Sequence, residues 1–329
     1  MNVKRIGIDL AKQVFQLHGV DYNEKVVLKK QLTRTKMLTY FQSLPPCLIG
    51  MEACGSAHYW ARELQQLGHT VKLMAPQFVK PYVKGNKNDS NDAEAICEAV
   101  SRPNMRFVTI KTVAQQDIQA VHRIRSELVK QRTAKGNQIR GLLAEYGVVV
   151  NKRIDVLRNA LPSLIEDTEN GLSADFRMLL EELRQDLITL DERVLVLTGK
   201  INVLAKADED AQRLQQIPGV GPMTATAIIS AVGDGKQFKC GRDLAAWLGL
   251  TPKQHSSGGK ERLLGISKRG DAYLRTLLIH GARSVLRVSE KKTDSLNCWL
   301  QNLWVALNKS SQSPTLFFQK PLLLWFEGT

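Results

Sequence analysis

Four carboxylates in the N-terminal third of the chain have the types and spacing of a metal-dependent site. Asp9 lies in the apolar segment IGIDLAK, Glu52 follows the apolar run LIGM, and Asp89 and Asp92 stand three apart in KNDSNDAEAICEAV. Residues i and i+3 share one helix face, so the last two can point together at whatever the first two acids face. Hard divalent cations hold several carboxylates close, because oxygen ligands suit them and their charge cancels the repulsion. The pattern predicts a Mg²⁺ site of the kind that promotes phosphoryl transfer.

Each acid also has an ordinary structural explanation. Asp89 or Asp92 can cap a helix or lie in its first turn, where the helix dipole favours negative charge. Glu52 can be a solvated residue at a strand end. Asp9 is the strongest argument for a metal, because an acid inside an apolar strand is costly to bury without a cation. Spacing alone leaves these alternatives open.

The elements that must position the acids alternate between strands and helices. Apolar periodicity predicts strands at residues 3–10, 14–19, 25–31, 47–52 and 70–74, and helices at 36–43, 56–67 and from about 92. Antiparallel strands followed by strand–helix alternation resemble the ribonuclease H-like arrangement. In that fold the catalytic acids come from the first strand, a central strand and a late helix, an order that the four acids match. We therefore predict an α/β, ribonuclease H-like (RuvC-like) domain over residues 1–110.

The middle of the chain has the pattern of long helices. Residues 113–146 are helical in period, and beyond them apolar residues alternate in spacings of three and four: Leu180, Leu183, Leu187, Leu190, Val194, Leu197, Ile201 and Leu204. A heptad seam of this length predicts a coiled coil, either between chains or folded back on the preceding helix. An ordinary amphipathic core helix is the alternative. Residues 111–210 are the predicted helical coiled-coil linker.

Two motifs mark the predicted C-terminal domain, a mainly α-helical region over residues 211–310. In LQQIPGVGPMTATAIISAVG, a Pro–Gly turn between helical segments predicts a helix–hairpin–helix, in which Gly219 and Gly221 let backbone amides approach a phosphate. A plain helix turn is the alternative. In QHSSGGKERLLGISKRGD, Ser256 and Ser257 stand on a predicted flexible Gly-rich loop before four cations: Lys260, Arg262, Lys268 and Arg269. A serine beside cations can attack a phosphate, although a solvated polar turn has the same composition.

Charge and composition narrow the partners. The 329-residue chain carries a formal net charge of +14, which favours a polyanionic partner, although a ribosomal or membrane-surface protein has the same excess. Residues 123–158 hold nine Lys/Arg against three acids, residues 236–292 hold thirteen against four, and residues 181–210 are acidic. We therefore expect two basic surfaces, separated by the acidic segment at residues 181–210, which has a different role. Five cysteines without CxxC pairs or zinc spacing, and no apolar run near ~18 residues, predict a cytoplasmic protein without structural zinc.

Taken together, these motifs resemble a transposase of the DEDD type, from the insertion-sequence family numbered 110 and its 1111 branch. The resemblance covers residues from about 3 to 305 and includes the N-terminal acids, the helical linker, the IPGVGP turn and the SGG loop in the family's order. It implies that Asp9, Glu52, Asp89 and Asp92 form the DEDD set that holds Mg²⁺. It also implies that Ser257 is the nucleophile, which attacks a phosphodiester and leaves a covalent protein–DNA intermediate.

The resemblance implies partners as well. Relatives complete a composite site between protomers, so we expect a homo-oligomer, a dimer or a tetramer on DNA, and they are guided by a structured RNA from the element itself. The tail at residues 311–329, SQSPTLFFQKPLLLWFEGT, departs from the family's closing helix and resembles a frameshifted or truncated end. Two other functions stay open: a metal-dependent RuvC-like endonuclease of the junction-resolvase kind, which needs no serine, and a non-catalytic nucleic-acid-binding protein.

Overall fold

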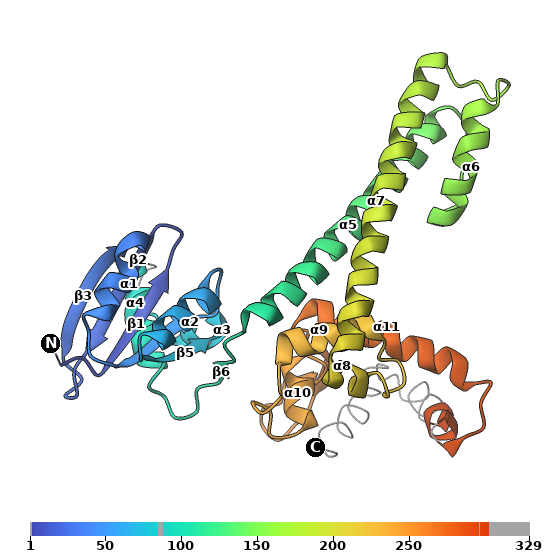
Figure 1. Ribbon diagram of the computed structural model, residues 1–329. Coiled ribbons are helices and arrows are strands. Elements are labelled where there is room, and N and C mark those ends of the chain that lie inside the picture. Colours follow the sequence, from blue (N-terminus) through green and yellow to red (C-terminus); the bar gives the residue numbers. More distant parts are fainter. Residues whose placement is uncertain (1, 85–87, 296, 303–329) are drawn as a thin grey trace. The chain divides into compact units, whose positions relative to one another are not determined.

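The computed structural model describes residues 2–84, 88–295 and 297–302 (Figure 1). It divides into two compact units between Thr112 and Val113. The tail predicted to be atypical, at residues 311–329, lies outside the described residues. In the described part of the chain, every helix is too short or too polar to cross a membrane.

A six-stranded mixed sheet forms the centre of the first unit, in the order β3-β2-β1-β4-β5-β6. The central strands β1, β4 and β5 are parallel, whereas β2, β3 and β6 each run antiparallel to a neighbour. The strand bounds are Arg5–Leu10 (β1), Val14–Val20 (β2), Val26–Thr33 (β3), Leu48–Glu52 (β4), Thr70–Met74 (β5) and Phe107–Val108 (β6).

Helices cover both faces of this sheet. One face of β1 and β4 carries apolar side chains, and the other face lies close to a helix. On one face, Ile6, Ile8, Ile49 and Met51 are fully buried in a core that also contains Phe41 and Trp60. The other face of β1 and β4 packs against α4. The helices are η1 (Arg34–Lys36), α1 (Met37–Gln42), α2 (Ala57–Gln66), α3 (Pro76–Val79), η2 (Lys80–Tyr82) and α4 (Asp89–Ala99).

The second unit is mostly helical, with one small two-stranded sheet. Its core gathers apolar residues such as Leu214, Ala225, Ile228, Leu244 and Leu274 from the short helices that follow α7. The elements are α5 (Val113–Glu145), α6 (Ile154–Glu166), α7 (Ala174–Ala207), α8 (Glu209–Leu214), α9 (Pro222–Val232), α10 (Gly241–Trp247), β7 (Pro252–Gln254), β8 (Leu263–Ile266) and α11 (Ala272–Ser289).

The predicted heptad seam lies on α7, which folds back along α5 of the same chain (Figure 1). Every seventh residue of the seam is buried: Leu180, Leu187, Val194 and Ile201. The alternate positions Leu183, Leu190, Leu197 and Leu204 are only partly buried. Of the two arrangements that the seam allowed, the described chain contains the intramolecular one.

Polar contacts join the basic helix α5 to α7. Lys135 lies 2.9 Å from the Asp186 carboxylate, and Arg132 lies 3.3 Å from Asp191. Arg125 donates a hydrogen bond to the Thr198 hydroxyl at 2.8 Å. The sequence predicted a basic surface at residues 123–158, but several of its cations are engaged in joining these two helices.

The predicted elements of the first unit are confirmed to within a few residues. The strand at 70–74 coincides with β5, and the largest boundary error is at α4, which begins at Asp89 rather than at about 92. The Asn88 side chain caps that helix by accepting a hydrogen bond from the Ser90 amide. The predicted Ser–Gly loop is the connection between β7 and β8, which form a hairpin there.

Candidate active site

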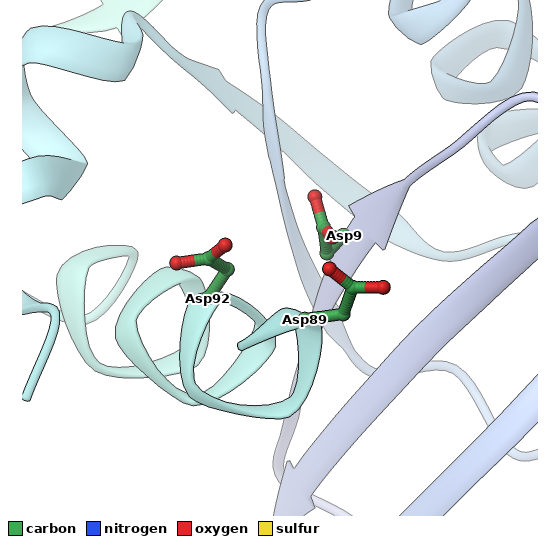
Figure 2. Close-up of side chains that lie close together, drawn as sticks. All are labelled: Asp9, Asp89 and Asp92. Carbon is green, nitrogen blue, oxygen red and sulfur yellow. The ribbon is translucent and has the colours of Figure 1, made fainter. Parts of the chain in front are cut away.

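Three of the four predicted acids converge in the first unit. Asp9 stands near the end of β1, and Asp89 and Asp92 lie in the first turn of α4 (Figure 2). One carboxylate oxygen from each acid lies within 4.8 Å of the corresponding oxygens of the other two. Asp9 and Asp92 are partly buried and Asp89 is exposed. The strand and the helix thus bring together acids that are eighty residues apart in the sequence.

The first turn of α4 holds both helix acids without using either as the cap. Asn88 provides the cap, so the explanation of Asp89 or Asp92 as N-cap residues does not apply. Both acids do occupy the first turn, where the positive end of the helix dipole lowers the cost of two neighbouring negative charges.

Glu52 lies beside this cluster, on the neighbouring parallel strand. Ile8 of β1 pairs with Met51 of β4, so Asp9 and Glu52 occupy the next position on each strand and share one sheet face. Burial raises the pKa of Glu52, and the negative charges of Asp9 and Asp92 raise it further. The fourth acid is therefore within electrostatic reach of Asp9 and Asp92, although its oxygens lie outside the closest group.

The donor set and its dimensions fit a hard divalent cation. Opposite oxygen ligands of one Mg²⁺ are about 4.2 Å apart, twice a bond length of about 2.1 Å. Neighbouring ligands are only about 3.0 Å apart, so the three oxygens, which lie within 4.8 Å of one another, need side-chain movements of up to about 1 Å to share one ion. Asp9, Asp89 and Asp92 are the residues that could hold the ion, with Glu52 next to them.

The predicted nucleophile lies in the second unit, on the tip of the β7–β8 hairpin. The Lys260 amide donates to the Ser257 carbonyl at 3.1 Å, and Gly258 and Gly259 between them have φ of +57° and +78°. Two consecutive positive φ angles define the tight turn of a two-residue hairpin and explain the Gly-Gly pair. Ser257 is exposed, and its neighbour Ser256 accepts a 3.4 Å hydrogen bond from the Arg262 amide.

The loop that carries Lys268 and Arg269 is anchored to the end of α10. The Lys268 amide donates to the Gly249 carbonyl at 3.0 Å, and a Cβ on Gly270 would stand 2.0 Å from the Trp247 carbonyl oxygen. This close backbone packing holds the two exposed cations on a fixed base. In the sequence this backbone contact is visible only as Gly249 and Gly270 at its two ends, and we did not predict it.

The two glycines of the IPGVGP turn have different environments. Gly219 has a φ of +86°, and a Cβ there would meet the Gly281 carbonyl oxygen of α11 at 2.8 Å. Its turn closes with a 3.0 Å hydrogen bond from the Val220 amide to Ile217. Gly221 is the N-cap residue of α9, has no atoms near an added Cβ, and makes no side-chain cap. Gly219 is therefore explained by packing, whereas no described atom fills the space where a Cβ on Gly221 would lie.

The second basic segment differs from the first in how its charges are compensated. Among the described residues, the ion pair from Lys236 to Asp234 is the only one formed by a cation of residues 236–292. The predicted nucleic-acid-binding cations Lys260, Arg262, Lys268 and Arg269 are all exposed. Uncompensated positive charge thus concentrates around the serine hairpin and the loop before α11.

Comparison with known proteins agrees with this arrangement. The family model described as Transposase IS116/IS110/IS902 family matches residues 211–296, and the DEDD transposase model of IS110 elements matches residues 6–148. A probable family 20 transposase of Pseudomonas aeruginosa is 55% identical over 304 residues, covering 92% of this chain and 90% of its own length. The transposase of the Coxiella burnetii insertion sequence IS1111A is 48% identical over 92% of this chain and 83% of its own.

A further relative extends the comparison: the IS1328 transposase of Yersinia enterocolitica is 42% identical over 91% of this chain and 89% of its own. The two matched regions contain all four acids and Ser257 respectively. Together, the matched models and the extent of these identities show that the chain belongs to the IS110/IS116/IS902 family of insertion-sequence transposases.

Proposed function

We propose that this transposase cuts and exchanges DNA strands with Ser257 as nucleophile, assisted by Mg²⁺ at Asp9, Glu52, Asp89 and Asp92. The convergence of Asp9, Asp89 and Asp92 from two separate elements is the observation that carries the proposal. Helix capping and strand-end solvation, the ordinary explanations of these acids, do not require three carboxylates to meet.

The acids have one task in this chemistry, which is to hold and orient the cation. Bound there, Mg²⁺ supplies positive charge that stabilises the phosphate oxygens of the scissile bond. Asp9 provides the fixed side of the site, because it stands on a central strand, and the α4 acids provide the other. Glu52 completes the set on β4, where burial and the charges of Asp9 and Asp92 raise its pKa, and a bound cation would offset these charges.

Ser257 performs the covalent step. Its hydroxyl oxygen bonds to the phosphorus, the bond from phosphorus to one DNA oxygen breaks, and the released strand keeps that oxygen as a hydroxyl. Exposure at a hairpin tip lets the serine reach a phosphodiester, and Lys260 and Arg262 lie within the same hairpin to offset the developing charge. Because the hairpin is exposed and only two-stranded, we propose that bound DNA orders it.

The architecture supports the finer assignments that belong to this proposal. The sheet order with its antiparallel β1–β2–β3 group and parallel β1, β4 and β5 supports a RuvC-like domain. The α8–turn–α9 segment supports a helix–hairpin–helix in which Gly221 approaches a phosphate. The α5–α7 pair supports a coiled-coil linker, and residues 1–110, 111–210 and 211–310 are the corresponding proposed domains.

The proposed partners follow from the charges and the exposed apolar positions. DNA and a structured guide RNA bind the cations of residues 236–292. Homo-oligomers form through the outer side of α7, where Leu195, Val196 and Val203 are exposed, rather than through the seam that α5 occupies. The protein acts in the cytoplasm, where its DNA substrate is located.

Trapping the covalent intermediate tests this function. A DNA end labelled at the scissile phosphate should transfer its label to wild-type protein, and peptide mapping should place it on Ser257. Ser257→Ala should retain DNA binding and lose strand exchange, whereas Ser256→Ala is the matched control and should keep it. Magnesium-dependent nicking without an adduct would instead favour an endonuclease of the junction-resolvase kind. The acid site also suits that function, because all four acids lie in the first unit.

A further inference from the structure

We propose that Arg5 and Gly7 are positioning residues that set α4 against β1 in the register that brings Asp89 and Asp92 to Asp9. The inference rests on the proposed metal site and adds the reason why its two halves meet. Neither residue is proposed to touch the metal or the DNA.

The contact follows one face of β1 and one side of α4. Arg5, Gly7 and Asp9 are alternate strand residues, so their side chains share a face. On α4, Cys97, Ala93 and Asp89 lie four residues apart and share a side of the helix. Two strand residues advance about 6.7 Å and four helix residues about 6.0 Å, so the two series stay in step over this length.

Gly7 makes the closest approach in this contact. A Cβ placed on it would stand 2.2 Å from the Ala93 carbonyl oxygen and 2.3 Å from the Cys97 amide nitrogen. Both are backbone atoms of the helix interior, so no side-chain rotation can relieve the overlap. Restoring an ordinary contact of about 3.4 Å requires α4 to move by about 1 Å.

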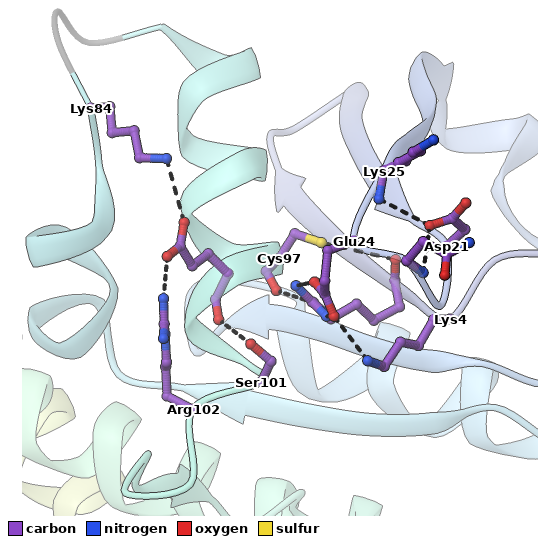
Figure 3. Close-up of polar contacts among 11 residues, drawn as sticks. Lys4, Asp21, Glu24, Lys25, Lys84, Cys97, Ser101 and Arg102 are labelled. Atoms are coloured by element: carbon purple, nitrogen blue, oxygen red, sulfur yellow. Dashed lines mark hydrogen bonds and ion pairs between the residues drawn. The ribbon is translucent and has the colours of Figure 1, made fainter.

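Arg5 fixes the other end of the same contact. It is a buried cation on β1, and its Nε donates to the Cys97 carbonyl at 2.9 Å. That carbonyl belongs to the last turn of α4, where no helical partner remains for it. The Arg5 guanidinium also forms an ion pair with Glu24, which Lys4 reaches at 2.9 Å; Figure 3 shows Lys4, Glu24 and Cys97 together.

Displacing α4 by 1 Å has a specific effect on a metal site. Mg²⁺ requires nearly ideal octahedral geometry at 2.0–2.1 Å, whereas Ca²⁺ accepts irregular sites at 2.3–2.6 Å. Moving Asp89 and Asp92 away from Asp9 should therefore weaken Mg²⁺ binding more than Ca²⁺ binding. Simple loss of stability would weaken both alike.

Gly19 provides a matched control in the same sheet. It pairs with Ile6, so it faces away from α4, and a Cβ on it would meet the Leu28 side chain at 3.0 Å. Gly19→Ala therefore crowds the sheet without touching the contact between β1 and α4. The comparison of Gly7→Ala with Gly19→Ala separates positioning from general destabilisation.

The experiment measures Mn²⁺ binding to the full chain by electron paramagnetic resonance of the unbound ion, with displacement by Mg²⁺ and by Ca²⁺. We expect Gly7→Ala to weaken Mg²⁺ at least tenfold and Ca²⁺ less than threefold, and Gly19→Ala to keep both within twofold. Arg5→Lys preserves the charge but not the geometry of the Nε donor. It should also weaken Mg²⁺ binding more than Ca²⁺ binding, by a smaller factor than Gly7→Ala. Circular dichroism establishes that each variant is folded.

The outcomes separate this inference from the function on which it rests. Asp9→Asn that binds Mn²⁺ like the wild type would refute the metal site itself. If Asp9→Asn loses binding while folded Gly7→Ala keeps wild-type Mg²⁺ affinity, the metal site stands and the positioning role is wrong. If Gly7→Ala does not fold, Arg5→Lys decides, and unchanged Mg²⁺ affinity in that variant overturns the proposal.

Discussion

Acidification should destabilise the second unit through one buried histidine, His122 of α5. Its Nε2 lies 2.9 Å from the Thr226 hydroxyl of α9, and its Nδ1 lies 2.9 Å from the Tyr273 hydroxyl of α11. Thr226 donates its own proton to the Pro222 carbonyl at 2.8 Å, so its oxygen accepts from Nε2. Nδ1 then carries no proton and accepts from Tyr273. A proton on Nδ1 would remove this hydrogen bond, and the Tyr273 proton would then have only the weak acceptor Met223 Sδ, 3.6 Å away.

The magnitude follows from the pKa of this group. Burial, and to a smaller extent the charge of Arg125, lower the pKa of His122 to about 4. A histidine in an unfolded chain has a pKa of about 6.5. The unfolded state therefore binds more protons between these values, so His122 contributes its full stability above about pH 6.5 and loses it as the pH falls toward 4. At ~1.4 kcal/mol per pH unit the whole contribution is about 3 kcal/mol, of which about 2 kcal/mol is lost by pH 5.

The assay compares the free energy of unfolding in urea at pH 8 and pH 5 for wild type and His122→Gln. Glutamine keeps one donor and one acceptor but does not titrate in this range. The wild type should lose about 2 kcal/mol more than the variant between the two pH values. Other titrating groups, including buried His18, are present in both proteins and cancel in the comparison.

His280→Gln makes the same chemical change at an exposed site on α11 and should leave the wild-type pH dependence unchanged. An equal loss in wild type and His122→Gln, within about 0.5 kcal/mol, would refute the reasoning, because that difference is below a single typical hydrogen bond. Direct titration of the His122 imidazole by nuclear magnetic resonance near 6.5 would refute it as well.

Two further predictions concern packing in the second unit. Leu187→Ala should lower the free energy of unfolding by about 2–5 kcal/mol, because this seam residue of α7 is fully buried, whereas Leu195→Ala, at an exposed position, should change it by at most about 0.5 kcal/mol. Urea unfolding measures both, and equal losses would contradict the packing of the α7 seam against α5. Gly219→Ala should lower the free energy of unfolding by about 1–3 kcal/mol, because Gly219 has a positive φ and lies against α11. Gly221→Ala should leave the melting temperature nearly unchanged. A Gly219→Ala protein as stable as the wild type would show that the contact with α11 does not contribute to stability.

Local pattern was sufficient to predict most elements of the first unit. Strand alternation and helix periodicity depend on neighbouring residues, so β1 to β5 and α2 could be located to within one or two positions. The short β6 and the β7–β8 hairpin escaped prediction. They contain few residues and little alternation, and their pairing is decided by partners elsewhere in the chain.

The charge pattern shows how a sequence feature can be recognised and misassigned. Basic residues 123–158 and acidic residues 181–210 are visible in the sequence, but composition does not reveal that the two segments face each other. Only the packing of α7 along α5 shows that Lys135 and Arg132 meet Asp186 and Asp191. The proposed nucleic-acid surface is then reduced to those described cations of residues 236–292 that form no such ion pair.

By itself, the sequence determined which residue types are present for the chemistry: four acids in a fixed order, a serine beside cations, and glycines where the chain turns. Tertiary structure alone decided that Asp9, Asp89 and Asp92 meet and that Glu52 stands slightly apart. The physical reason is that side-chain type and local period are properties of neighbouring residues, whereas the distance from β1 to α4 depends on backbone contacts between segments eighty or more residues apart. At Gly7 the missing Cβ is what permits that contact.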